Sequence, residues 1–286
     1  MTCSVKQELL AGLDRKDPGS APDTRRSIPL TKIARSFGNA AHNYDRHAEL
    51  QRKVADQLLA KSADQVADAV ILDLGCGTGY CSAVLHARYP QAFLLAVDLA
   101  LPMLHASTRR ELAALHPLCA DAQVLPLQSQ AVDLLVSSLT MQWCADPEQL
   151  FAELFRVTKP GGQVLLSTFG PATLAEIRRA WQAADGNVHV NDFIPLATLE
   201  QLCSRAGFAC VAVTELRKPC YPSLRAVARE LKGIGAHNMN RGQNRGLTSP
   251  AAFARAEAAF GLHAVAGQGV PVTYEVYYLN LRRPLH

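Results

Sequence analysis

The sequence lacks any long hydrophobic run. No apolar stretch approaches the roughly 20 residues that a membrane-spanning helix needs. Residues 1–13 contain neither a sustained apolar segment nor a small-residue cleavage site, so they do not resemble a secretory signal. We therefore expect a cytoplasmic protein that makes no contact with membranes.

Metal-binding and disulfide patterns are also missing. None of the eight cysteines has C-x-x-C spacing, and several lie in apolar patterns where a reduced cysteine acts as a small hydrophobic residue. The sequence therefore indicates no metal and no disulfide framework. The cysteines are residues 3, 76, 81, 119, 144, 203, 210 and 220.

Charge of either sign is scarce. Charged residues make up 19% of the chain and the formal net charge is +4, which excludes nucleic-acid binding unless the charge is clustered. Hydrophobic residues reach 49%, enough for a sizeable core, so global disorder is excluded too. The length of 286 residues permits one or two domains.

What the sequence does contain is a glycine-rich turn after a short apolar segment. Val70–Leu74 has the pattern of a strand buried on both faces. Gly75, Gly77 and Gly79 follow at alternate positions, where they allow a tight turn and close approach of a ligand to the backbone. Tyr80–Tyr89 then has helical periodicity. Strand, turn and helix form the first half of a nucleotide-binding βαβ unit.

The spacing of these glycines distinguishes two kinds of cofactor. The dinucleotide fingerprint G-x-G-x-x-G requires a glycine where this chain has Tyr80. The pattern present, Asp73-x-Gly-x-Gly-x-Gly, resembles motif I of the seven-stranded S-adenosylmethionine (SAM) methyltransferases. The next strand, Phe93–Val97, ends at Asp98, whose carboxylate could accept hydrogen bonds from both ribose hydroxyls. A glycine turn with incidental acids, or a pyrophosphate cofactor, is the alternative.

Two later strand ends extend this site. A short strand over Pro117–Ala120 is followed by Asp121, which suits the amine of adenine because a carboxylate accepts where adenine donates. A turn-initiating role for Asp121 is the alternative. The fourth strand, Val132–Ser138, should end beside the glycine turn, so residues 138–143 are expected to border the methyl group that is transferred.

A helical stripe precedes the first strand. Phe37, Ala41, Tyr44, Ala48, Gln51, Ala55 and Leu58 recur at helical spacing in a segment that continues as a helix to about Ala60. Tyr44 and Gln51 are its polar-tipped members. Such a helix can lie over the carboxyl ends of the strands, where ligands bind in open α/β sheets. Tyr44 could therefore cover a cofactor or simply pack in the core.

The remaining pattern predicts a Rossmann-like, doubly wound α/β fold with a seven-stranded, mostly parallel sheet, N-terminal helices and a helical lid insertion. Residues 1–28 are expected to be a disordered leader and residues 29–286 a single domain, with 217–262 as the lid and a mobile loop at 233–248. Further helices are expected at 102–115, from 147, at 173–184, 195–206, 223–232 and from 249, and further strands at 163–167, 208–216 and, antiparallel, 270–280.

A local excess of positive charge lies in the lid. Between Arg217 and Arg245 there are seven basic residues and one acid, Glu230. The helical pattern over 223–232 would leave the basic side chains outside. A solvated face is one interpretation, and a docking surface for an acidic partner is the other. The seven are Arg217, Lys218, Arg225, Arg229, Lys232, Arg241 and Arg245.

Four stretches resemble one family, the malonyl-acyl-carrier-protein O-methyltransferases of biotin synthesis. They are residues 37–44 with 47–51, residues 139–144 (Leu-Thr-Met-Gln-Trp-Cys), residues 231–236 (Leu-Lys-Gly-Ile-Gly-Ala) and residues 271–274. The resemblance implies methyl transfer from SAM to the free carboxylate of a malonyl thioester, on acyl carrier protein or coenzyme A, with S-adenosylhomocysteine as product. The methyl ester would then prime pimeloyl synthesis. A monomer with an acyl carrier protein as partner is expected.

Sheet position, the helical stripe and the charge pattern, taken together with this reaction, assign roles to residues. Tyr44, Gln142 and Trp143 would position the reactants and exclude water, with no general base, since carboxylates are already ionised at pH 7. Substrate contacts would come from Arg225, Arg229 and Lys232. The cofactor-binding candidates are Tyr44, Gln51, Asp73, Gly75, Gly77, Gly79, Asp98, Leu99, Met103, Asp121, Ala122 and Ser138. The alternatives are another methyltransferase for small carboxylates or quinones, and a SAM-binding protein without turnover.

Overall fold

The computed structural model describes residues 28–63, 69–112, 115–236 and 249–286. The predicted leader lies outside this part except for residue 28, and so does the predicted loop from residue 237 onward. Within the described residues, no helix combines the length and the apolar character that crossing a bilayer requires.

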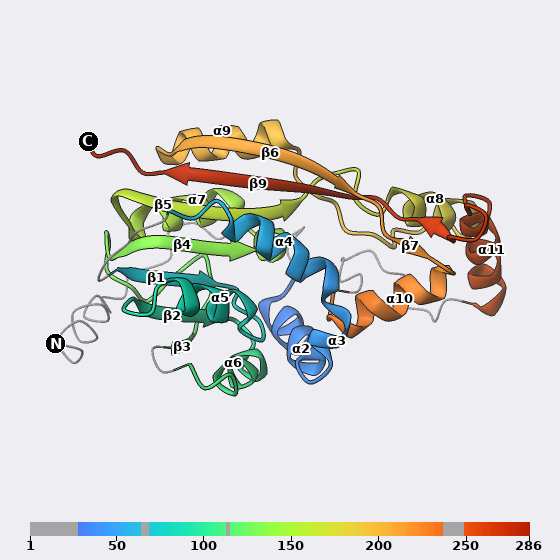
Figure 1. Ribbon diagram of the computed structural model, residues 1–286. Helices are drawn as coiled ribbons and strands as arrows, with labels where there is room; N and C mark the ends of the chain where they lie inside the picture. The colour runs from blue at the N-terminus through green and yellow to red at the C-terminus, as the bar shows by residue number, and fades with distance from the viewer. Residues whose placement is uncertain (1–27, 64–68, 113–114, 237–248) are drawn as a thin grey trace.

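A seven-stranded sheet forms the centre of the molecule (Figure 1). Its order is β3-β2-β1-β4-β5-β9-β6, in which only β9 runs antiparallel to its neighbours β5 and β6. The predicted fold class is confirmed, including the antiparallel final strand. The strands are β1 Val70–Leu74, β2 Phe93–Asp98, β3 Leu115–Cys119, β4 Val132–Ser138, β5 Thr158–Phe169, β6 Ala209–Arg217 and β9 Tyr274–Arg282.

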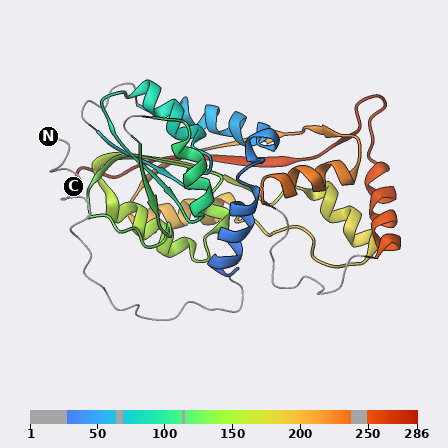
Figure 2. The same cartoon turned by 90° about the horizontal axis from the view of Figure 1, so that it is seen from below.

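Helices cover both faces of the sheet (Figure 2). Adjacent residues of β1 show why: Ile71 packs in the cluster that contains α4 and α5, whereas Leu72 packs in the one that contains α7 and α9. Because successive strand residues point to opposite faces, the continuous apolar run of β1 fills two cores at once. The helices are α4 Glu49–Leu59, α5 Tyr80–Arg88, α6 Leu101–Thr108, α7 Pro147–Val157 and α9 Leu196–Ala206.

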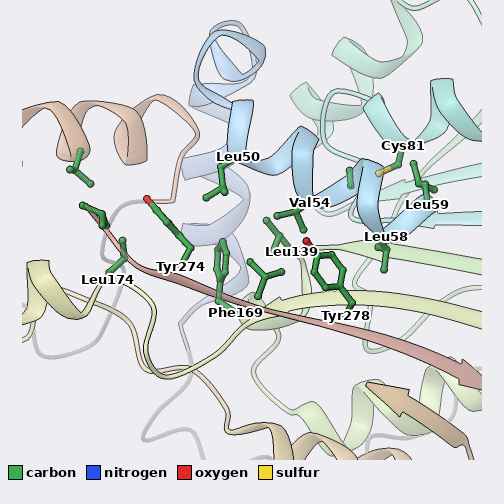
Figure 3. Close-up of a cluster of buried hydrophobic side chains, with 14 of the residues drawn as sticks. Leu50, Val54, Leu58, Leu59, Cys81, Leu139, Phe169, Leu174, Tyr274 and Tyr278 are labelled. Atoms are coloured by element: carbon green, nitrogen blue, oxygen red, sulfur yellow. The ribbon is translucent and has the colours of Figure 1, made fainter. Parts of the chain in front are cut away.

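A second group of helices lies beyond the carboxyl ends of the parallel strands (Figure 1). At this end of the sheet, Phe169 of β5 and Tyr274 of β9 pack at 5.7 Å between ring centres (Figure 3). Ligands of doubly wound folds bind at this edge, so these helices enclose the expected site. The elements are α2 Leu30–Ala40, α3 Tyr44–His47, α8 Ala175–Ala184, α10 Leu224–Gly233, α11 Pro250–Gly261 and a two-stranded sheet of β7 Cys220–Tyr221 with β8 Val270–Pro271.

The single helical stripe predicted from Phe37 to Ala60 is wrong. The chain forms three helices there, α2, α3 and α4, with a turn at residues 41–43. Long-range contacts explain the break. Asp45 accepts a hydrogen bond from Thr78 Oγ1 at 2.6 Å and an ion pair from Arg110 at 3.1 Å, so α3 is tied to the glycine turn instead of continuing α2.

Two other element boundaries differ from the prediction. Helix α6 ends at Thr108, and β3 already begins at Leu115. The predicted strand 270–280 is divided into β8 and β9, because Thr273 leaves the ladder to donate its N–H and Oγ1 to the Glu176 carboxylate at 2.9 and 2.7 Å.

Candidate active site

Two glycines of the turn are needed for different reasons. Gly75 has φ +73°, and a Cβ there would lie 2.0 Å from Thr140 Oγ1, so the turn and the end of β4 can meet only at a glycine. Gly77 has φ +54°, and no atom lies within 4 Å of the place where its Cβ would be. Its missing side chain therefore leaves open space beside the backbone, which a ligand can fill.

Asp98 connects the turn to the end of β2. Its Oδ2 accepts the N–H of Gly77 at 2.9 Å and its Oδ1 accepts that of Ala100 at 2.8 Å. Burial raises the pKa of Asp98, and these backbone hydrogen bonds act in the opposite direction. A carboxylate has about four acceptor positions, so roughly two remain for hydroxyl groups of a ligand.

A cavity of about 720 Å³, part of it open to solvent, lies over this turn. It brings together most of the residues predicted to bind a cofactor: Tyr44, Gly75, Gly77, Asp98, Leu99, Met103, Asp121, Ala122 and Ser138. None of the described residues that line it is an arginine, a lysine or a histidine, so it offers no cationic side chain to a pyrophosphate. Acidic and apolar walls suit a nucleoside. We call it the cofactor cavity.

Three predicted cofactor ligands do not line this cavity. Asp73 is buried below the turn, where its Oδ2 accepts the Ser82 hydroxyl at 2.5 Å, and burial raises its pKa to about 7. Gly79 faces α6 instead, since a Cβ there would lie 2.8 Å from Ser107 Cβ. Gln51 points into another space. None of these three side chains therefore lines the cofactor cavity, and for Asp73 the predicted support of the cofactor through the turn stays a prediction.

That other space is a second chamber of about 740 Å³, also partly open. Phe37, Tyr44, Leu139 and Trp143 line both it and the cofactor cavity. Phe37 and Trp143 meet edge to face at 5.2 Å. Tyr44 and Trp143, which were predicted to lie at the point of methyl transfer, are located where the two spaces meet. Leu139, Phe169, Leu174 and Tyr274, labelled in Figure 3, belong to the same chamber wall.

Neutral polar groups supply the hydrogen bonds of the second chamber. Among the described residues that line it there is neither an arginine nor a lysine, and the histidine that lines it, His189, pairs with Asp185 at 3.0 Å. Gln51 Oε1 and Asn191 Oδ1 are buried without a hydrogen-bond partner. Gln142, by contrast, accepts the Thr168 hydroxyl at 3.1 Å. Buried amides without partners are uncommon in folded proteins and indicate a ligand that would complete them.

The predicted substrate-binding cations lie elsewhere. Arg225, Arg229 and Lys232 are exposed on the outer face of α10, while Leu231 and Ile234 of the same segment line the chamber. The guanidinium of Arg225 lies over the ring of Phe253 at 5.0 Å. None of the three lines the second chamber.

Sequence reasoning also missed part of the cofactor cavity. Leu30, Ile33 and Phe37 of α2 line it, as does Cys144, just beyond the predicted range 138–143. The helical spacing of Ile33, Phe37 and Ala40 was visible, but spacing alone cannot distinguish a wall of a cavity from a wall of the core.

Comparison with known proteins agrees with this geometry. A family model described as "Methyltransferase domain" matches residues 72–166. Among solved structures, the YcgJ protein from Bacillus subtilis superposes with a TM-score of 0.58 at 16% identity, covering 80% of this chain and 98% of that one. A putative methyltransferase from Bacillus halodurans gives 0.56 at 13% identity, covering 81% and 99%. These likenesses establish the fold.

Curated relatives are much more similar in sequence. The malonyl-[acyl-carrier protein] O-methyltransferase of Laribacter hongkongensis is 41% identical over 267 residues, 89% of each chain. That of Serratia marcescens is 40% identical over 91% of this chain and 97% of its own. The biotin biosynthesis bifunctional protein BioHC of Cellvibrio japonicus is 44% identical over 90% of this chain. This chain spans about half of that protein, 51% of its length.

The fold, the glycine turn and the cofactor cavity define a methyltransferase that uses S-adenosylmethionine as its methyl donor. Within that class, the chain belongs to the malonyl-[acyl-carrier protein] O-methyltransferase family.

Proposed function

We propose that this protein transfers the methyl group of SAM to the free carboxylate of malonyl-acyl carrier protein. The observation that carries the proposal is the meeting of two spaces at Tyr44 and Trp143, one suited to a nucleoside and one to a small polar group. The names of the relatives supply the substrate.

The residues present fit the cofactor. The carboxylate of Asp98 retains acceptor positions for ribose hydroxyls. Asp121 lines the cavity, and although its Oδ1 accepts the Gln123 N–H at 3.0 Å as in a turn, its remaining acceptor positions would take the adenine amine. The open space at Gly77 would hold the part of the cofactor nearest the turn. Bound SAM supplies an electrophilic methyl group that a carboxylate oxygen takes up by in-line displacement, with no proton transferred.

The second chamber would hold the substrate carboxylate through neutral donors. The unpaired atoms are the amide oxygens of Gln51 and Asn191, so each amide would turn over to present its two N–H groups to the carboxylate. Such bonds are charge-assisted by the carboxylate alone, without the second charge that an arginine would add. They would orient the carboxylate while leaving its oxygen nucleophilic, so we assign them the recognition role first predicted for Arg229 or Lys232.

Tyr44 would position reactants rather than act as a base. Burial and the nearby carboxylate of Asp98 raise the pKa of Tyr44 further above its ordinary value of 10. Its hydroxyl therefore stays protonated at neutral pH and can only donate or accept hydrogen bonds. With Trp143 and Phe37 it would close the junction against water, which competes with the substrate carboxylate.

The test is direct methylation. The protein should methylate malonyl-acyl carrier protein with labelled SAM, succinyl-acyl carrier protein less well, and acetyl-acyl carrier protein not at all, since the last has no free carboxylate. Label in the acetyl substrate, or in no carrier substrate, would contradict the proposal. We further propose that the enzyme acts as a cytoplasmic monomer without nucleic acid or membrane, and that residues 217–262 cover the substrate.

A further inference from the structure

A groove on the outer surface, between α2, α3 and α10, concentrates positive charge. It is lined by Lys32, Arg35, His42, His47, Arg229 and Lys232, together with Ser36, Asn39, Ala40, Asn43 and Gly233. Its four permanent cations equal the formal net charge of the whole chain, +4. None of the described residues lining it is acidic. We call it the basic groove.

Acids near the groove interact with other groups. Glu230, the one acid of α10, accepts the Tyr221 hydroxyl at 2.7 Å, although its charge still acts on His47. Asp45 of α3 pairs with Arg110 on the side of the glycine turn, and Glu49 pairs with Lys53 at 2.7 Å. The described acids of α3, α4 and α10 thus have partners outside the lining of the groove.

Only a thin wall separates the basic groove from the second chamber. In each of the three helical segments, neighbouring residues face opposite sides. In α2, Ser36 lines the groove and Phe37 lines the chamber. At the start of α3, Asn43 lines the groove and Tyr44 lines the chamber. In α10, Lys232 lines the groove, whereas Leu231 and the following Ile234 line the chamber. Gly233 lets α10 approach α3 closely, because a Cβ there would lie 2.3 Å from His47 Cδ2. The groove and the chamber therefore lie on opposite sides of the same closely packed segments.

We propose that the basic groove binds the phosphate of the phosphopantetheine arm that carries the malonyl group. This rests on the proposed function. A malonyl thioester is neutral along its arm except at its two ends, the carboxylate and the phosphate. The neutral chamber takes the first and the basic groove takes the second, so the arm is fixed at both ends across the wall. The groove combines four cations with amide side chains, the donor types that bind a phosphate.

The experiment compares two ligands that differ only in the phosphate. Binding of phosphopantetheine and of pantetheine to the S-adenosylhomocysteine-loaded protein is measured by calorimetry. The wild type should bind phosphopantetheine at least about tenfold more tightly, roughly what one charge-assisted hydrogen bond supplies. The double variant Arg229→Glu with Lys232→Glu should lose that preference. Arg225→Glu with Arg205→Glu, which changes the net charge equally outside the groove, should keep it.

Each outcome of this experiment supports or contradicts the phosphate site. Absence of a phosphate preference in the wild type, or its survival in the groove variant, would overturn the proposal. So would a groove variant that loses activity on malonyl-acyl carrier protein yet keeps the phosphate preference, since the groove would then read the acidic surface of the carrier. Should the double variant fail to fold, the single Arg35→Glu takes its place. Methylation of malonyl-acyl carrier protein by the wild type is scored separately, and its failure would refute the function rather than the groove.

Discussion

At the scale of single residues, Asp98 has the clearest task. We expect Asp98→Ala to weaken SAM binding by roughly 1–3 kcal/mol, because ribose hydroxyls and the Gly77 N–H lose their acceptor. Titration calorimetry measures this directly. Asp98→Asn, which keeps one acceptor oxygen, should lose less. Unchanged affinity in a folded Asp98→Ala protein would rule the assignment out.

Gln51 presents an unusual combination of burial and missing partners. An orphaned buried amide costs about 1–3 kcal/mol, so Gln51→Leu should leave the ligand-free protein as stable as the wild type or more so. Activity on malonyl-acyl carrier protein should nevertheless fall about tenfold or more, the value of one hydrogen bond to a charged group.

Gln142→Leu is the matched control, since Gln142 already has Thr168 as a partner. That substitution should lower the melting temperature, because it orphans a buried hydroxyl. A Gln51→Leu protein that loses stability and activity together would show that Gln51 has a purely structural role.

Tyr44 should be tolerant of losing its hydroxyl but not its ring. Tyr44→Phe is expected to retain most of kcat, because the pKa of the hydroxyl excludes it as a base, whereas Tyr44→Ala opens the junction between the two spaces to water. Single-turnover rates and SAM affinity separate the two effects. Equal inactivity of both variants would reveal a chemical role for the hydroxyl.

At the scale of elements, the contact between α2 and the end of α10 holds the site closed. Ser36 Oγ donates to the Gly235 carbonyl at 2.9 Å, and a Cβ at Gly235 would lie 2.9 Å from the Ser36 carbonyl oxygen. Gly235→Ala should therefore displace α2, which lines the cofactor cavity, and weaken SAM binding as well as stability.

Gly186→Ala is the control for that substitution. Gly186 has a similar positive φ, +67°, but nothing lies within 4 Å of its absent Cβ. It should lose only the roughly 1–2 kcal/mol of a left-handed alanine and should leave SAM affinity unchanged. Equal loss of affinity in both variants would exclude a role for the α2–α10 contact.

The same scale shows what the sequence could predict. Strands such as Val70–Leu74 and Val132–Ser138 were predicted to the residue, because the continuous apolar run of a buried strand can be read directly from the sequence. The division of α2, α3 and α4 was not, because Asp45 is drawn to Thr78 and Arg110, which are far along the chain. Likewise, helical periodicity placed Arg225 correctly on the outer face, but only α11 reveals that it covers Phe253.

At the scale of the whole molecule, Asp73 links stability to pH. Burial raises its folded-state pKa from 3.8 to about 7. Between about pH 4 and pH 7 the unfolded chain releases this proton while the folded protein keeps it, so stability should fall as the pH rises through that window and level off above it. The full change is on the order of 4 kcal/mol, at about 1.4 kcal/mol per unit.

Asp73→Asn removes the titration while keeping an acceptor for Ser82. Urea unfolding of the wild type and this variant between pH 4 and pH 8 should give converging stabilities at low pH and a more stable variant at high pH. Parallel curves would show that Asp73 ionises normally.

The position of β9 has a consequence for synthesis of the protein. This strand fills the place between β5 and β6, yet it begins at Tyr274, about a hundred residues after β5 ends at Phe169. At roughly 5–20 residues per second, the ribosome leaves the inner edge of β5, with Val164, Leu165 and Leu166, unpaired for about 5–20 s. An open apolar edge of this kind is a template for aggregation. The nascent chain therefore exposes this edge to other chains until β9 emerges and completes the sheet.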